Sequence, residues 1–180
     1  MKIVLVGYRA AGKSTLGRLL SDALDMPFLD VDRGIEQRIG DQTLTAFYKE
    51  VGEEGFRPIE TDVVVEMCTT DRAVIAFGAG SLMRARNQQA ATENSLVVYL
   101  QVPVAELWQR IQSDPSSDQT RPNLAGGGVE EVDHMLAQRE PVYLACADLV
   151  VDGTEQPEAC LLYTSPSPRD ATLPRMPSSA

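Results

Sequence analysis

Short apolar runs alternate with amphipathic segments along most of the chain. Residues 2–7 form an apolar run rich in β-branched side chains, and the run ends at Gly7. This pattern is typical of a strand that is buried on both faces. A stripe of apolar residues at helical spacing follows directly and comprises Leu16, Leu19, Leu20, Ala23 and Leu24. We therefore expect a strand, a tight glycine-containing turn and a helix that packs back on the strand.

The alternation continues through four more strands. These are expected at residues 27–29, 73–77, 96–100 and 148–151. Helices are expected over most of 34–70, with breaks near Gly40 and around Gly52 and Gly55, and at 84–92, 103–111 and 129–145. Strands that alternate with helices predict a parallel sheet with right-handed crossovers. The predicted fold is therefore α/β, with three α/β/α layers around a central five-stranded parallel sheet, and with ligands beyond the carboxyl ends of the strands.

Two segments lie outside this pattern. Residues 112–128 are rich in Ser, Asp, Pro and Gly, and a loop of this length in a compact domain is usually a functional lid or a disordered segment. Residues 161–180 are rich in proline and have no helical period, which is typical of a disordered tail. The tail resembles non-native read-through, although a natural flexible tail would have the same composition. We therefore predict one domain over residues 1–160, which lacks a final helix, and a disordered tail over 161–180.

The composition narrows the class of protein. The 180 residues carry a formal net charge of −10, which disfavours non-specific binding to nucleic acid or to anionic membranes. No apolar run approaches the roughly 20 residues of a membrane-spanning helix, and no leader precedes the first strand, so we expect a cytoplasmic protein. Three separated cysteines and one histidine predict no zinc site. An enzyme of this charge that binds anionic substrates must concentrate its few arginines at the site.

The turn after the first strand carries a phosphate-binding motif. Residues 7–14 match G-x-x-x-x-G-K-[ST] between an expected strand and an expected helix, a context that makes a chance glycine-rich turn a poor alternative. Gly7 and Gly12 let successive backbone N–H groups point at phosphate oxygens. Lys13 reaches the β- and γ-phosphates, and Ser14 ligates Mg²⁺. The predicted ATP-binding residues of this turn are Gly7, Ala10, Ala11, Gly12, Lys13, Ser14 and Thr15.

Further motifs follow this turn along the chain. They are residues 29–32 with 35–38, 56–60, 77–80, 120–122 and 139–143. In this order and spacing they resemble the motifs of the shikimate kinase family, and the resemblance covers about residues 1–158. It implies a P-loop kinase with a lid loop that transfers the γ-phosphoryl group of ATP to the 3-hydroxyl of shikimate, a step of aromatic amino-acid biosynthesis. It also implies ATP and Mg²⁺ as cofactors, and we expect a monomer with no nucleic-acid or membrane partner.

The resemblance assigns roles to two aspartates and two arginines. Asp32 is expected to bind the acceptor hydroxyl as general base, which suits an alcohol nucleophile, and Asp30 is expected near Mg²⁺ with Ser14. Either aspartate could instead cap the following helix. Arg57 and Arg139 are expected to hold the shikimate carboxylate, because a guanidinium can bind a carboxylate through two parallel hydrogen bonds. Without the other motifs, exposed arginines in surface ion pairs would be the better interpretation.

The glycine-rich turn after the third strand departs from the family. The resemblance places Gly78, Ala79 and Gly80 at the acceptor, where the family has three glycines. If residue 79 needs a positive φ, alanine there costs about 1–2 kcal/mol. If its φ is ordinary, the added methyl group crowds the acceptor pocket and affects acceptor identity or KM.

Three more residues are assigned to ATP by the resemblance. Arg121 lies in the 112–128 loop and is expected to reach phosphate as charge develops in the transition state, while the loop closes over ATP. A plain surface loop is the alternative. Arg110 and Pro157 align with the positions that enclose adenine, and Pro157 also stands where a last helix would begin.

Two other functions stay open from the residues alone. One is a related kinase for gluconate or a nucleoside monophosphate, and the other is a nucleotide-binding protein without catalysis. The two-arginine carboxylate site speaks against a nucleotide acceptor, and the presence of both Asp32 and Arg121 speaks against a non-catalytic protein. The remaining conspicuous residues have ordinary interpretations, with Glu53 and Glu54 as a solvated or capping pair and Tyr143 as part of the core.

Overall fold

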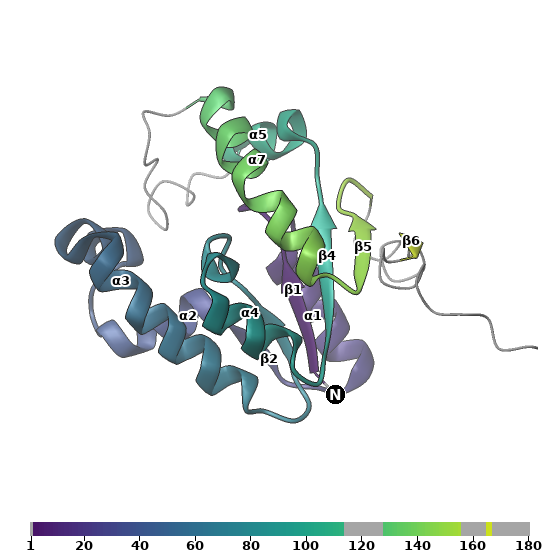
Figure 1. The fold of residues 1–180 in the computed structure, drawn as a ribbon, viewed down its shortest axis with the longest axis horizontal. Coiled ribbons are helices and arrows are strands. Elements are labelled where there is room, and N and C mark those ends of the chain that lie inside the picture. The colour runs from purple at the N-terminus through teal and green to yellow at the C-terminus, as the bar shows by residue number, and fades with distance from the viewer. Residues whose placement is uncertain (1, 114–127, 156–164, 167–180) are drawn as a thin grey trace, which may run out of the picture.

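A computed structural model describes residues 2–113, 128–155 and 165–166 (Figure 1). The strands are β1 (Lys2–Val6), β2 (Phe28–Asp30), β3 (Val74–Ala76), β4 (Ser95–Gln101), β5 (Leu149–Asp152) and β6 (Ser165–Pro166). The helices are α1 (Lys13–Leu24), α2 (Val31–Ile39), α3 (Leu44–Cys68), α4 (Ala85–Thr92), α5 (Val104–Ser113) and α7 (Val129–Cys146), with a short 3-10 helix η1 (Ser81–Met83). Each strand expected from the sequence is present, with ends that differ by one or two residues.

All strands belong to one sheet in the order β2-β3-β1-β4-β5-β6. The first five run parallel, which confirms the predicted α/β fold with a five-stranded parallel sheet. β6 adds two residues antiparallel to β5 and was not expected from the sequence. Because β3 lies between β1 and β2, the carboxyl ends of these three strands meet at one edge, where the predicted site residues follow them.

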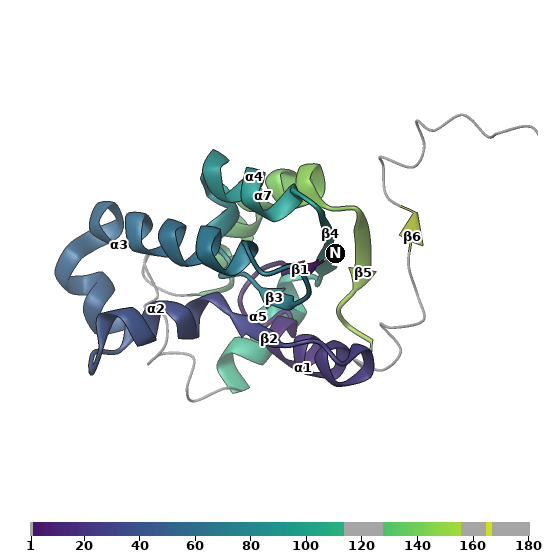
Figure 2. The same cartoon turned by 90° about the horizontal axis from the view of Figure 1, so that it is seen from below.

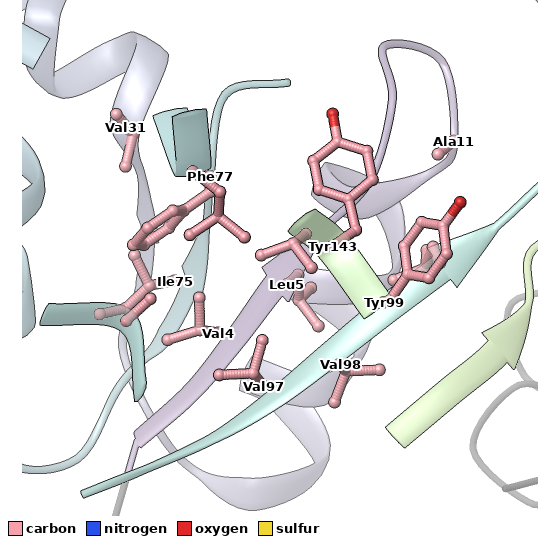
Figure 3. Packing of buried hydrophobic residues seen from close by; sticks show 14 of the residues in the cluster. Val4, Leu5, Ala11, Val31, Ile75, Phe77, Val97, Val98, Tyr99 and Tyr143 are labelled. Carbon is pink, nitrogen blue, oxygen red and sulfur yellow. The ribbon is translucent and has the colours of Figure 1, made fainter. Parts of the chain in front are cut away.

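Helices cover both faces of the sheet. Figure 2 shows α1 on one side of the strands and α4 and α7 on the other, which gives the three layers that the sequence predicts. The interior is formed by strand residues such as Val4, Leu5, Ile75 and Val97, each 0% exposed (Figure 3). Burial on both faces explains why these strands read as continuous apolar runs rather than as alternating ones.

Helices α1 and α3 differ in part from the sequence expectation. The apolar stripe of α1 is buried only near its start, because Leu24 at its end is 42% exposed. α3 bends at Gly52, whose φ is 69°, while Gly55 continues the helix. A Cβ on Gly55 would lie 2.7 Å from the Cβ of Val51, so this glycine serves close packing and not a break.

The described residues contain no helix long and apolar enough to cross a membrane. Residues 114–127 of the predicted 112–128 loop, with Arg121, lie outside the described residues, and so do Pro157 and all of the predicted tail except residues 165–166. Residues 112–113 belong to α5. The division into a domain over 1–160 and a tail over 161–180 therefore stays a prediction.

Candidate active site

The phosphate-binding turn joins β1 to α1. Its backbone takes positive φ values at Gly7 (146°), Ala10 (61°) and Gly12 (94°). A Cβ on Gly7 would lie 2.8 Å from the carbonyl oxygen of Leu100, so only glycine fits there. The conformation of Ala10 was not expected, and it costs about 1–2 kcal/mol for an L-residue. Such strain is typical of ligand-binding loops, and the curled backbone matches the cradle that the motif predicts.

Two side chains at the start of α1 face the cavity above this turn. Lys13 is buried, and its Nζ donates to the carbonyl oxygens of Gly7 (3.0 Å) and Tyr8 (2.7 Å), which holds the ammonium group over the loop. Ser14 Oγ donates to Asp30 Oδ2 at 2.9 Å. The cavity has a volume of about 580 Å³, and the residues expected to bind ATP that line it are Ala10, Gly12, Lys13, Ser14, Thr15 and Arg110.

Ser14 and Asp30 together offer oxygen ligands of the kind that Mg²⁺ prefers. Within the described residues, no cluster of three or more His, Cys, Asp or Glu side chains could hold a metal ion by itself. A magnesium ion that serves a nucleotide keeps several waters and phosphate oxygens as ligands, so one hydroxyl and one carboxylate are enough. The residues at this position therefore fit a Mg²⁺–nucleotide complex.

The two aspartates after β2 have different positions. Asp30 is the N-cap of α2, and its Oδ1 accepts a hydrogen bond from the backbone N–H of Asp32 (3.1 Å). The capping alternative is therefore present at Asp30 in addition to the contact with Ser14. The helix begins at Val31 and not near Gly34 as expected, because its cap, Asp30, is the last residue of β2. Asp32 is half-buried and lines two cavities. One is the cavity above the phosphate-binding turn, which we call the nucleotide cavity, and the other lies beside it.

The second cavity, which we call the acceptor cavity, has a volume of about 110 Å³ and lies between α3, the turn after β3 and α7. Apolar side chains such as Tyr48, Phe56 and Met135 form part of its wall. Its polar lining combines three guanidinium groups with carboxylates, which suits a small organic anion with hydroxyl groups. It brings together all the residues predicted to bind the acceptor, namely Asp32, Arg57, Gly78, Ala79, Gly80 and Arg139.

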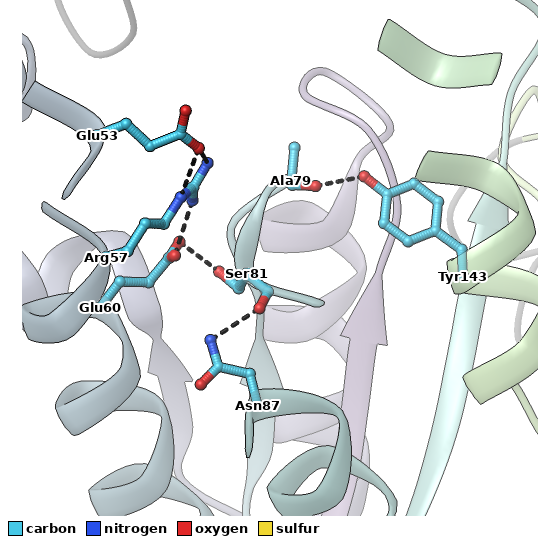
Figure 4. Close-up of polar contacts among 7 residues, drawn as sticks. All are labelled: Glu53, Arg57, Glu60, Ala79, Ser81, Asn87 and Tyr143. Atoms are coloured by element: carbon cyan, nitrogen blue, oxygen red, sulfur yellow. Dashed lines mark hydrogen bonds and ion pairs between the residues drawn. The ribbon is translucent and has the colours of Figure 1, made fainter. Parts of the chain in front are cut away.

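Arg57 is the most deeply buried arginine of the acceptor cavity, with 8% of its surface exposed (Figure 4). Its Nη1 donates to Glu60 Oε2 (2.8 Å), and its Nε and Nη2 both donate to Glu53 Oε1 (3.0 and 2.9 Å). Glu60 Oε1 in turn accepts from Ser81 Oγ (2.7 Å), and the Ser81 carbonyl accepts from Asn87 Nδ2 (2.7 Å). The alternative of an exposed surface arginine is therefore wrong for Arg57.

The pKa of Arg57 is raised above its ordinary value. Burial acts to lower it, but the ion pairs and hydrogen bonds with Glu60 and Glu53 raise it by more. The guanidinium therefore stays charged and available to an anion. The pKa of Tyr48 is also raised, first by burial and then by the negative charge of Glu53. The charges of Arg57 and Arg139 act in the opposite direction on Tyr48.

The turn after β3 approaches two of these groups closely. A Cβ on Gly80 would lie 2.7 Å from Arg57 Nη1, and a Cβ on Gly78 would lie 2.9 Å from Asp32 Oδ1. Ala79 between them is not among the described residues with positive φ, so the backbone strain considered for it is wrong. Its side chain is buried and lines the acceptor cavity. An effect of the methyl group on the acceptor stays a prediction.

α7 forms the opposite wall of the acceptor cavity and is tied to this turn. The hydroxyl of Tyr143 donates a hydrogen bond to the carbonyl oxygen of Ala79 (Figure 4). Tyr143 is also a core residue, as expected, with its ring centroid 5.3 Å from that of Tyr99. One turn earlier, the guanidinium of Arg139 lies 5.7 Å from the ring centroid of Tyr8.

Arg110 connects the nucleotide cavity to the end of the sheet. Its Nη2 donates to the carbonyl of Gly153 (2.8 Å), its Nη1 to the carbonyl of Ala10 (3.4 Å), and its Nε to Glu106 Oε1 (3.0 Å). This position beside the phosphate-binding turn is compatible with the expected contact to the nucleotide. Arg121 and Pro157 lie outside the described residues, so their predicted roles are not tested.

The residues that support Arg57 were missed by the sequence analysis, which assigned no function to Glu53, Glu60, Ser81 or Asn87. The two glutamates stand four residues before and three after Arg57, so helical spacing could have suggested both ion pairs. The interpretation of Glu53 as a solvated or capping residue is incomplete, since its exposed side chain also binds Arg57. Ser81 and Asn87 belong to other elements, and no local pattern predicts that they complete the network.

Comparison with known proteins identifies the family. Residues 9–165 match the sequence profile of shikimate kinase. A shikimate kinase of Pseudomonas fluorescens (strain Pf0-1) is 42% identical over 156 residues, which cover 86% of this chain and 88% of that protein. One of Chromohalobacter salexigens is 43% identical over 150 residues, covering 83% and 81%. The crystallised shikimate kinase of Acinetobacter baumannii in complex with shikimate matches with a TM-score of 0.81 and 33% identity over 89% of each chain. The chain therefore belongs to the shikimate kinase family of ATP-dependent small-molecule kinases.

Proposed function

We propose that this kinase phosphorylates the 3-hydroxyl of shikimate. The observation that carries the proposal is the position of Asp32, whose side chain lines both the nucleotide cavity and the acceptor cavity. A carboxylate at this boundary can meet both an acceptor hydroxyl and the phosphate that the hydroxyl attacks. Shikimate, with one carboxylate and a hydroxylated ring, matches the arginines and the apolar walls of the acceptor cavity.

The nucleotide end of the site is proposed to bind ATP through the turn at residues 7–15. The backbone N–H groups and the N-terminus of α1 hold the phosphates, and Lys13 carries a positive charge to the β- and γ-phosphates. Ser14 and Asp30 would hold Mg²⁺, with Asp30 acting through water. Bound Mg²⁺ neutralises negative charge on the phosphates and orients them. Arg110 and Pro157 are proposed to enclose the adenine.

The acceptor end is proposed to hold shikimate by its carboxylate. Arg57 and Arg139 bind the carboxylate, and the backbone of residues 78–80 approaches the ring. Asp32 accepts the proton of the 3-hydroxyl as its oxygen attacks the γ-phosphorus, and the bond from the γ-phosphorus to the bridging oxygen breaks to release ADP. Lys13 and Arg121 stabilise the charge that develops on the transferred group.

The walls of the acceptor cavity favour shikimate over gluconate. Tyr48, Phe56 and Met135 offer apolar surface to a ring, and an open-chain polyhydroxy acid would leave this surface unmatched. We also propose that the enzyme acts as a monomer.

The test is ADP release in a coupled assay of the full chain with Mg-ATP, with shikimate, with gluconate or with no acceptor. We expect release that depends on shikimate. In Asp32→Asn we expect kcat to fall by about 10²–10⁴-fold with ATP binding unchanged. Asp62→Asn is the matched control, because Asp62 is exposed on α3 and lies outside both cavities. Equal turnover with gluconate, or a folded Asp32→Asn variant with the wild-type kcat, would contradict the proposal.

A further inference from the structure

Arg57 binds two carboxylates of its own helix, and the two are held in different ways (Figure 4). The side chain of Glu60 is 3% exposed and is fixed from its other oxygen by Ser81. The side chain of Glu53 is 61% exposed, and within the described residues its hydrogen bonds go to Arg57 alone. Glu60 is therefore held in place independently of Glu53, which leaves open what the charge of Glu53 contributes.

Glu53 occupies one edge of the guanidinium of Arg57, which lines the acceptor cavity. Its Oε1 accepts from both Nε and Nη2 and so covers the side edge of Arg57. The terminal edge, formed by Nη1 and Nη2, faces Gly80, where a Cβ would lie 2.7 and 2.8 Å from these two atoms. Because Gly80 has no side chain, Arg57 can lie close against the turn after β3 and line the acceptor cavity. Glu53 and Glu60 use three of the five N–H groups of Arg57, which leaves two for an acceptor carboxylate.

The charge balance makes Glu53 unfavourable for an anionic acceptor. The acceptor cavity is lined by equal numbers of basic and acidic side chains, namely Arg9, Arg57 and Arg139 and Asp32, Glu60 and Glu131. Glu53 binds Arg57 from outside this lining and adds one negative charge. Two carboxylates on neighbouring edges of one guanidinium repel each other.

We infer that Glu53 is a positioning residue that sets acceptor affinity, because its charge offsets that of Arg57 and weakens the binding of an acceptor carboxylate. Glu53 acts through Arg57 and does not line the acceptor cavity. The inference rests on the proposed function, which assigns the acceptor carboxylate to Arg57. It predicts that removal of the Glu53 charge makes the enzyme bind its acceptor more tightly.

Glu54 provides a matched control for this role. Both glutamates follow the bend at Gly52 and lie in the first turn of the second straight section of α3, where a negative charge interacts favourably with the helix N-terminus. Glu54 makes no hydrogen bond or ion pair with any described residue. Glu54→Gln therefore loses the same charge on the same turn and leaves Arg57 untouched.

The experiment compares Glu53→Gln with Glu54→Gln in the full chain. An amide oxygen at position 53 can still accept from Arg57, so the substitution removes charge and keeps the contact. We expect the KM for shikimate to fall by about two- to fivefold in Glu53→Gln, the size of one solvent-screened charge contact, with kcat and the KM for ATP unchanged. The difference should shrink in about 0.5 M salt, because screening weakens exposed charges. Glu54→Gln should behave as wild type.

A higher or unchanged KM for shikimate in Glu53→Gln, or an equal fall in Glu54→Gln, would overturn the inference. Titration of the ATP-free proteins with cyclohexanecarboxylate separates this result from the proposed function. If the wild type does not use shikimate, the proposed function fails, while tighter binding of this simple carboxylate by Glu53→Gln than by wild type still supports the role of Glu53. Equal or weaker binding overturns it.

Discussion

The methyl group of Ala79 distinguishes this chain from the three-glycine turn of its family. Its φ is not positive, so removal of the methyl group relieves no backbone strain. We expect Ala79→Gly to lower the free energy of unfolding by about 0.5–1 kcal/mol, because glycine makes the unfolded chain more flexible. We also expect a lower KM for shikimate, because the residue lines the acceptor cavity, and an unchanged KM for ATP. Urea unfolding and the coupled assay measure these quantities, and a more stable variant would instead indicate strain at this position.

At the scale of residues, the sequence predicts which side chains form the site better than it predicts their contacts. The phosphate-binding turn is recognisable because its strand, glycines and helix are consecutive in the chain. The network around Arg57 is not recognisable in this way, because Ser81 reaches Glu60 from another element and is itself held by Asn87. An arginine four residues after a glutamate looks like a surface ion pair until its surroundings are known.

At the scale of elements, the acceptor cavity depends on one hydrogen bond between α7 and the turn after β3. The Tyr143 hydroxyl donates to the Ala79 carbonyl across 64 residues of sequence. We expect Tyr143→Phe to leave this buried carbonyl without its partner and to lower the free energy of unfolding by about 1–3 kcal/mol. The KM for shikimate should rise, because the two walls of the cavity lose their tether, while the KM for ATP should not change.

Tyr99→Phe is the matched control for this prediction. The ring of Tyr99 packs on that of Tyr143, but its hydroxyl donates to Glu140 and not to the turn. This variant should lose stability and keep the acceptor KM of wild type. Urea unfolding and steady-state kinetics measure both quantities. A Tyr143→Phe variant as stable as wild type would contradict the proposed role of this hydrogen bond. The same change of the KM for shikimate in both variants would contradict it as well.

The bend of α3 shows what periodicity can and cannot predict about an element. The apolar pattern locates the helix and points to a break around two glycines. It does not say which glycine breaks the helix, because Gly52 takes a positive φ only in the folded chain while Gly55 is pressed against Val51. The choice matters for the site, since the bend at Gly52 starts the straight section on which Glu53 and Arg57 lie one turn apart.

At the scale of the whole molecule, the fold concentrates positive charge where anions are to bind. The chain has 16 basic and 26 acidic residues. The two cavities are lined by six basic residues, Arg9, Lys13, Arg33, Arg57, Arg110 and Arg139, against five acidic ones, Asp30, Asp32, Glu36, Glu60 and Glu131. The sequence analysis expected such a concentration from the net charge, but only the parallel sheet brings these positions from several helices to one edge.

Cys68 links the stability of the whole molecule to pH. It ends α3 beside the first strand, and its carbonyl accepts a hydrogen bond from Lys2 Nζ (2.7 Å). Burial raises the pKa of its thiol from 9.0 to about 11, although the charge of Lys2 acts to lower it. The folded protein therefore holds the thiol proton more tightly than the unfolded chain does. The stability that follows from this difference is complete below about pH 9 and is lost as the pH rises towards 11.

Two measurements check this prediction. Iodoacetamide at about pH 8 should modify Cys68 slowly in the native chain and rapidly in urea, because the thiolate is the reactive form, and peptide mapping separates it from the other cysteines. The free energy of unfolding should decline between about pH 9 and 11, and Cys68→Ala should reduce this decline. Part of this decline in the free energy of unfolding should remain in Cys68→Ala, because the pKa of the buried Tyr99 is raised as well. Burial is the first cause of that rise and Glu140 the second. Alkylation of native Cys68 at the rate of a free cysteine would show instead that α3 separates from the sheet without unfolding of the molecule.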